Sequence, residues 1–69
     1  MQPDEFNKIV GNNLRKARIN RGFSQQALGN ACEITFQQVQ KYEKGANGLS
    51  AYRLFQMANV LDISPISLS

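Results

Sequence analysis

The sequence predicts an all-α protein, a compact bundle of four to five short helices, and three observations support this. Apolar residues recur at spacings of three and four along most of the chain, the period of a helix with one buried face. Serine or threonine precedes most of these segments, as expected of helix caps. No segment alternates between apolar and polar residues in the manner of a half-buried strand.

The composition is that of one small domain. The 69 residues, 42% of them hydrophobic, suffice for a single core, so we expect one domain over residues 1–69. Cys32 is the only cysteine and the chain has no histidine, so neither a disulfide nor a Cys–His site is expected. Cys32 is expected to fill a small apolar gap. The apolar runs are too short to span a membrane, and the start MQPDEF does not resemble a signal peptide.

The first helix is expected to begin at Asp4 or Glu5, since acidic residues suit a helix N-terminus and Pro3 is expected to lie outside the helix. It should end near Asn20, with Gly22 as a left-handed C-terminal cap. The residues expected to face the core are Phe6, Ile9, Val10, Leu14 and Ala17.

Two short helices should follow. Ser24 is expected to cap a helix that runs to about Ala31. Thr35 and Gln38 have capping-box spacing and should start a third helix that ends at Glu43 or Lys44. The second helix is expected to bury Ala27, Leu28 and Ala31.

The remaining chain predicts a loop over residues 45–48 and a fourth helix capped by Ser50. Ser64 and Pro65 form a helix start, which leaves room for a fifth helix of about one turn. The fourth helix is expected to bury Leu54, Met57, Ala58 and Leu61. The apolar tail, consisting of Ile63, Ile66 and Leu68, either joins the core or forms a dimer surface.

The third helix has one face that folding does not require. At about 100° per residue, Thr35, Val39 and Tyr42 share one side and form a predicted core stripe. The other side carries Phe36, Gln37, Gln40, Lys41 and Lys44. Amides, ammonium groups and an aromatic ring are the groups that contact base edges and phosphates in the major groove of DNA. We therefore interpret residues 24–43 as a DNA-binding helix-turn-helix.

The distribution of charge favours an anionic partner more than the net charge of +3 does. The acidic residues Asp4, Glu5 and Asp62 lie near the two ends of the chain. Between residues 8 and 21 every charged residue is a cation, namely Lys8, Arg15, Lys16, Arg18 and Arg21.

The segments LRKARINRGFSQQALG, TFQQVQKYEKG and SAYRLFQMANVLDIS resemble the phage-repressor type of helix-turn-helix domain, the lambda-repressor-like or Cro/XRE family. The resemblance extends from Ile9 to Ser67. It implies a bundle of four or five helices in which the third helix, residues 35–44, lies in the major groove and the second crosses above the backbone. Members of this family commonly act as dimers.

The third helix is expected to contact bases. Gln37 and Lys41 are four residues apart and project from one stripe about 6 Å apart along the axis. Glutamine can donate to and accept from adenine, and lysine suits the two acceptors of guanine. Phe36 is expected either to press against thymine methyl groups or to pack against the turn or the first helix. The predicted base contacts are Thr35, Phe36, Gln37 and Lys41.

Other residues are expected to contact phosphates, which gives affinity without sequence choice. Ser24 and Gln25 stand at a helix start, which attracts anions, and the resemblance implies a phosphate contact at Gln25. Backbone N–H groups near Gly48 are expected to assist. Arg15 and Arg21 either contact the DNA backbone or are solvated. The predicted phosphate contacts are Ser24, Gln25, Gln40, Lys44, Asn47 and Arg53.

The resemblance also implies an ion pair between Arg18, at the end of the first helix, and Glu43, which closes the third. Its role would be to orient the recognition helix, and removing one partner should cost a few kcal/mol, more than the roughly 0–1 of an exposed pair. One position departs from the family, which commonly has a glycine with positive φ in the turn. If Glu33 adopts that conformation here, the strain is about 1 kcal/mol.

These features predict a sequence-specific double-stranded DNA-binding transcriptional regulator, a repressor, located in the cytoplasm at the nucleoid. It is expected to act without a cofactor, as a homodimer on a two-fold site. The domain is expected either to stand alone or to be the N-terminal part of a longer regulator. The alternative is a protein-binding or dimerisation module of an antitoxin or larger regulator. No enzyme is expected, because the sequence lacks histidine, paired carboxylates and a glycine-rich phosphate loop.

Overall fold

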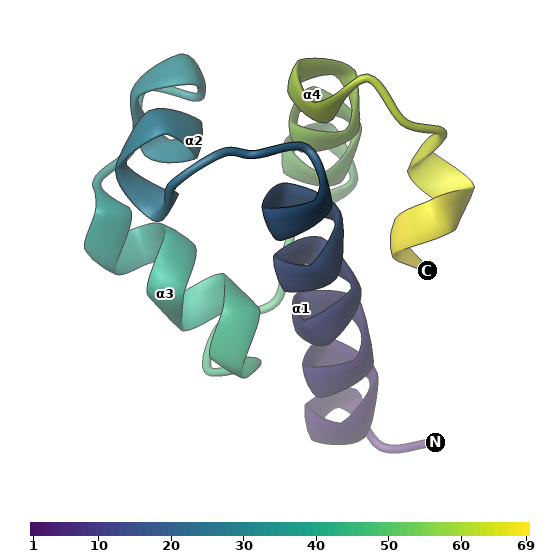
Figure 1. The fold of residues 1–69 in the computed structure, drawn as a ribbon. Helices are drawn as coiled ribbons and strands as arrows, with labels where there is room; N and C mark the ends of the chain where they lie inside the picture. Colours follow the sequence, from purple (N-terminus) through teal and green to yellow (C-terminus); the bar gives the residue numbers. More distant parts are fainter.

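The structure, a computed structural model, describes residues 1–69 and is built from helices without strands. The elements in order are α1 (Pro3–Asn20), α2 (Gln25–Ala31), α3 (Phe36–Lys44), α4 (Ala51–Leu61) and a short 3-10 helix, η1 (Pro65–Leu68). Figure 1 shows α2 and α3 together on one side of α1 and η1 on the other. The predicted all-α architecture is confirmed. None of these helices is both long enough and apolar enough to cross a membrane.

The predicted helix starts are present. Ser24, Thr35 and Ser50 each accept a hydrogen bond from the backbone N–H three residues later, at 2.9–3.2 Å. Each of these bonds satisfies a donor that the first turn of a helix leaves without a partner, a contribution of about 1 kcal/mol. Ser64 likewise caps η1. However, α1 begins at Pro3, before Asp4 and Glu5, because the first helical position needs no N–H donor and so tolerates proline.

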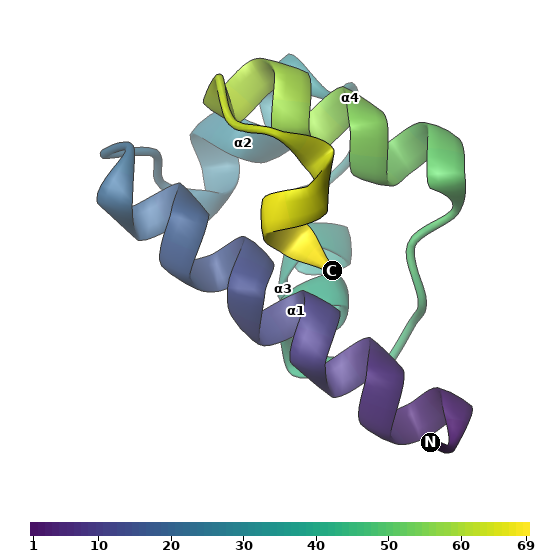
Figure 2. The ribbon, with the colours of Figure 1, turned by 90° about the vertical axis from the view of Figure 1, so that its right-hand side faces the viewer.

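The buried face of α1 begins later than predicted. Val10 and Leu14 are buried and Ala17 is half-buried, but Phe6 and Ile9 are 48% and 44% exposed. The N-terminal turns of α1 project beyond η1 (Figure 2). The prediction that Phe6 and Ile9 face the core was therefore wrong.

The buried face of α2 also differs from the prediction. Ala27 and Ala31 are exposed, whereas Leu28, Gly29 and Cys32 are buried. With seven residues, α2 makes only two turns, which is too short for periodicity to define one face, and alanine is compatible with either side. The prediction that Cys32 fills an apolar position is confirmed, because it is 2% exposed and lies in the core cluster.

The C-terminal turn closes the core. Leu68 is completely buried and η1 contacts both α1 and α4, whereas Ile66 is 83% exposed and Ile63 is half-buried. The apolar tail is thus divided, with Leu68 in the core and Ile66 at the surface. The buried hydrophobic cluster consists of Leu14, Leu28, Cys32, Val39, Met57, Ala58, Leu61 and Leu68.

Gly22 has the predicted positive φ, of 76°, just after the end of α1.

Arg21 joins the ends of two helices. The guanidinium of Arg21 donates from Nε to the Leu61 carbonyl oxygen and from Nη2 to that of Asp62, both at 2.7 Å. Arg21 therefore satisfies carbonyl groups at the end of α4, a role that neither of the two expected alternatives included.

Glu33, in the turn between α2 and α3, has a φ of 59° and is therefore left-handed. Glu33→Gly should raise the free energy of unfolding by roughly 0.5–1 kcal/mol, because glycine adopts this conformation without a Cβ clash. Glu33→Ala keeps the Cβ atom and serves as the control, with little gain expected. Denaturant titration of both variants measures the difference, and a glycine variant less stable than the alanine variant would contradict the strain argument.

Candidate nucleic-acid interface

One side of α3 is buried and the other is open to solvent. Val39 is completely buried and Tyr42 is half-buried, as predicted. On the opposite side Gln37, Lys41 and Lys44 are exposed. The helix therefore presents one amide and two ammonium groups that the protein's own core does not use.

The edges of this surface differ in detail from the sequence prediction. Thr35 is exposed and does not belong to the core stripe, because as the N-cap it has an extended backbone (φ −76°, ψ 157°) outside the helical phase. Phe36 is 37% exposed, so its ring is available at the start of the helix while part of it packs against the protein. Gln40 is half-buried at the other edge.

The orientation of α3 is fixed by a buried ion pair. Arg18 on α1 donates from Nε to Glu43 Oε2 at 2.6 Å and from Nη2 to Glu43 Oε1 at 3.1 Å. Its Nη1 donates to the Phe23 carbonyl oxygen at 2.8 Å. This bidentate arrangement is the geometry in which arginine and carboxylate bind most strongly. The structure thus contains the pair that the sequence implied, between α1 and the last turn of α3.

Gln25 completes this arrangement and was assigned a different role from sequence. Its Nε2 donates to Glu43 Oε1 at 3.1 Å, so the carboxylate is bonded to α1 and to the first residue of α2. No pattern in the sequence relates Gln25 to Glu43, because they are 18 residues apart and belong to different helices. If Gln25 also contacts a phosphate, its side-chain NH₂ group has to donate to both Glu43 and the phosphate.

A glycine allows α1 to approach α3 closely. A Cβ atom on Gly11 would collide with the carbonyl oxygens of Tyr42 and Glu43. Gly11 is itself buried, one turn before Leu14 and two turns before Arg18. The backbone contact at Gly11 and the ion pair at Arg18 therefore hold the same end of α3 against α1.

The loop after α3 offers free backbone donors. Gly45 ends the helix in the left-handed conformation, with φ 75°, and Asn47 is exposed. The backbone N–H groups of Gly48 and Leu49 donate no hydrogen bond within the protein. Gly48 and Asn47 are exposed, so the Gly48 N–H group and the Asn47 side chain are available to an external acceptor.

Arg53, predicted to contact phosphate beside that loop, also forms hydrogen bonds within the protein. Its Nη1 donates to the Cys32 carbonyl oxygen at 3.1 Å and to Gln56 Oε1 at 2.6 Å, so the guanidinium is turned toward the end of α2.

Burial raises the pKa of the Cys32 thiol, and the nearby charge of Arg53 opposes this shift. The thiol is therefore in its protonated form at neutral pH.

The two lysines on the exposed side of α3 are unpaired. The ion pairs within 4.0 Å are Arg18–Glu43 and Arg21–Asp62, the second of them exposed. Lys41 and Lys44 have no carboxylate within that distance. The exposed side of α3 is therefore cationic, without internal neutralisation.

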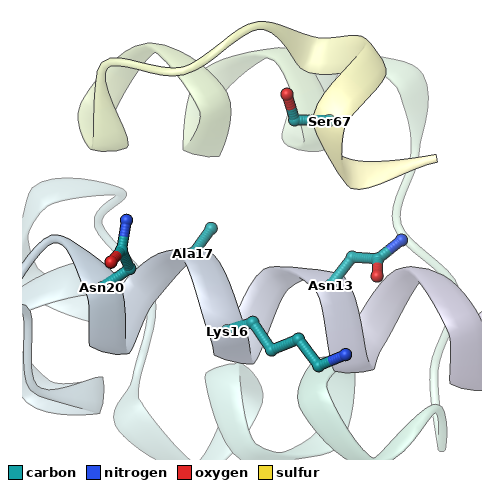
Figure 3. A pocket seen from close by; sticks show the side chains of 5 residues that line it. All are labelled: Asn13, Lys16, Ala17, Asn20 and Ser67. Carbon is teal, nitrogen blue, oxygen red and sulfur yellow. The ribbon is translucent and has the colours of Figure 1, made fainter.

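A shallow groove lies elsewhere, between α1 and η1. Figure 3 shows its lining of Asn13, Lys16, Ala17 and Asn20 from α1 and Ser67 from η1. Figure 1 places η1 and α3 on different sides of α1. The groove therefore does not belong to the surface formed by α3.

Two short helices joined by a tight turn, the second of them exposed along a cationic face, define a helix-turn-helix domain. The chain belongs to the helix-turn-helix family HTH_3, whose match covers residues 14–68.

Known proteins of similar sequence and structure agree with this. The chain is 50% identical over 56 residues to an uncharacterized HTH-type transcriptional regulator, y4aM, of Sinorhizobium fredii, covering 81% of this chain and 39% of that protein. It superposes on the restriction-modification controller protein C.AhdI from Aeromonas hydrophila with a TM-score of 0.92 and 26% identity over 100% of both chains. The clp gene regulator ClgR from C. glutamicum, at 21% identity and a TM-score of 0.88 over 91% of this chain and 82% of that one, shares the fold. The chain thus spans less than half the length of the regulator y4aM.

Glu43→Ala should lower the free energy of unfolding by about 3–5 kcal/mol, because it leaves the Arg18 guanidinium, 11% exposed, without its carboxylate. Glu33→Ala, which removes an exposed carboxylate, is the control and should change stability by less than about 1 kcal/mol. Thermal denaturation of both variants measures this. Equal losses would show that the ion pair does not stabilise the fold.

Proposed function

We propose that this chain is a sequence-specific, double-stranded DNA-binding transcription regulator that inserts α3 into the major groove. The observation that carries the proposal is the exposed face of Gln37, Lys41 and Lys44 on a helix held at its far end by Arg18 and Glu43. A rigid helix with free amide and ammonium groups can contact base edges without reorganising. Membership of the helix-turn-helix family and the names of the relatives support the same function.

The proposed roles follow the position of each side chain. Gln37 and Lys41 contact bases from the middle of the exposed face, and Thr35 and Phe36 contact bases at the helix start. Phosphate contacts come from the start of α2, from the second half of α3, from the loop that follows and from the first turn of α4. The residues proposed for phosphate contact are Ser24, Gln25, Gln40, Lys44, Asn47 and Arg53.

Repression by occupation of an operator, as a homodimer on a two-fold site in the cytoplasm, is part of the same proposal. Two half-sites about one helical turn apart would place both α3 helices on one face of the duplex. Ile66 and Phe55, which are 83% and 61% exposed, offer apolar surface for the second copy.

Selection of bound duplexes from a randomised pool, at two salt concentrations, tests the proposal and supplies the preferred site. On that site Gln37→Ala should cost about 1–3 kcal/mol of binding free energy and relax the choice at one base pair, because the amide no longer pairs with a base edge. The same variant should bind random DNA about as well as the parent protein. An equal loss on both kinds of duplex would remove Gln37 from the base contacts.

Lys44→Ala should weaken binding to all sequences alike. It should make the slope of log affinity against log salt shallower by about 0.9, since one fewer phosphate is neutralised. Titrations of random duplex at several salt concentrations measure this slope, with Gln37→Ala as the control in which it stays constant. An unchanged slope for Lys44→Ala would place that side chain away from the phosphates.

A further inference from the structure

The N-terminal half of α1 lies against the loop through which the chain leaves α3. Figure 2 shows the connection from α3 to α4 passing beside this part of α1. A Cβ atom on Gly45 would lie 2.8 Å from the Cα atom of Lys8, and one on Gly48 would lie 2.9 Å from Asn7 Oδ1. Glycine at both positions therefore lets α1 touch the loop, and the Lys8 side chain emerges next to the residue that follows Lys44.

Lys8 has no internal partner at this position. It is exposed and forms no ion pair within 4.0 Å, although Asp4 and Glu5 stand in the first turn of the same helix. The residue across the contact is Gly45, which follows the likewise unpaired Lys44 in the chain, and the same loop has backbone N–H groups at Gly48 and Leu49 that donate no hydrogen bond within the protein. The loop after α3 and the adjoining turn of α1 thus combine two ammonium groups that form no ion pair with two backbone N–H groups that donate no hydrogen bond within the protein.

We propose that Lys8 binds the DNA backbone and extends the phosphate-contacting surface from the α3–α4 loop onto α1. This inference rests on the proposed function. When α3 enters the groove, its C-terminal end faces the phosphates that border the groove, and Lys8 lies beside that end. An ammonium group on a flexible stem binds a phosphate as a point charge, so the contact contributes affinity without sequence preference. It makes α1 a DNA-contacting element as well as the support of α3.

The test must separate the charge of Lys8 from the packing of its stem against Gly45. Lys8→Met keeps an unbranched apolar stem of similar length and removes the ammonium group. Lys16→Met is the matched control, because Lys16 is exposed on the same helix but borders the groove between α1 and η1 (Figure 3). Both variants should melt at the temperature of the parent protein.

Affinity for random duplex DNA is then measured between 50 and 200 mM salt. Lys8→Met should make the slope of log affinity against log salt shallower by about 0.9, so that its affinity deficit shrinks about 3.5-fold across this range. Lys16→Met should leave the slope unchanged. If Lys8→Met keeps the parental slope while Lys44→Ala lowers it, Lys8 is not a contact and the proposed function stands. If Lys8→Met and Lys16→Met changed the slope equally, the effect would come from the net charge of the protein, and the proposed contact at Lys8 would be wrong. Absence of salt-dependent binding by the parent protein would overturn both proposals.

A second measurement locates the contact. On the selected site, single phosphates are replaced in turn by uncharged methylphosphonates and the loss of affinity is recorded at each linkage. In the Lys8→Met variant, neutralising one particular phosphate should no longer reduce affinity. That phosphate should lie near the one whose neutralisation no longer reduces affinity in Lys44→Ala. If every linkage that weakens the parent protein also weakens Lys8→Met to the same extent, the proposed contact is wrong.

Discussion

The buried carboxylate of Glu43 is the constraint on which the rest of the molecule depends. It accepts hydrogen bonds from Arg18 on α1 and from Gln25 on α2, so three helices are joined at one group. A buried charge without partners is strongly destabilising, and this requirement fixes how α1, α2 and α3 meet. The backbone contact at Gly11 adds a steric limit at the same place. The exposed face of α3 is therefore set by interactions on its hidden side.

Much of this architecture was predictable because it depends on local chemistry. Ser24, Thr35 and Ser50 cap helices through bonds to residues three positions away, so short sequence patterns contain the information. The buried faces of α3 and α4 also followed from periodicity, as at Val39 and Met57. In the same way, the exposure of Gln37 and Lys41 follows from their angle relative to that core stripe.

The errors arise where long-range packing decides. Phe6 and Ile9 continue the apolar pattern of α1, but the bundle ends before it reaches them, and no local pattern reports where the other helices end. Gln25, Arg21 and Arg53 also donate to groups distant in sequence, and the sequence predicted none of these contacts. Long polar side chains reach several alternative partners, so their position on a helix does not determine their contacts.

The dependence of α3 on Arg18 has a consequence for protein engineering. With nine residues, α3 is too short to be stable as an isolated peptide, so its shape and its aim are both supplied by the surrounding bundle. Transplanting only the outward residues of α3 onto a relative would preserve their presentation. A graft of the whole helix would also transfer Glu43. The recipient protein would then need a glycine and an arginine on its first helix, at the positions that correspond to Gly11 and Arg18. The specificity of such a domain is thus modular at the level of side chains, not of helices.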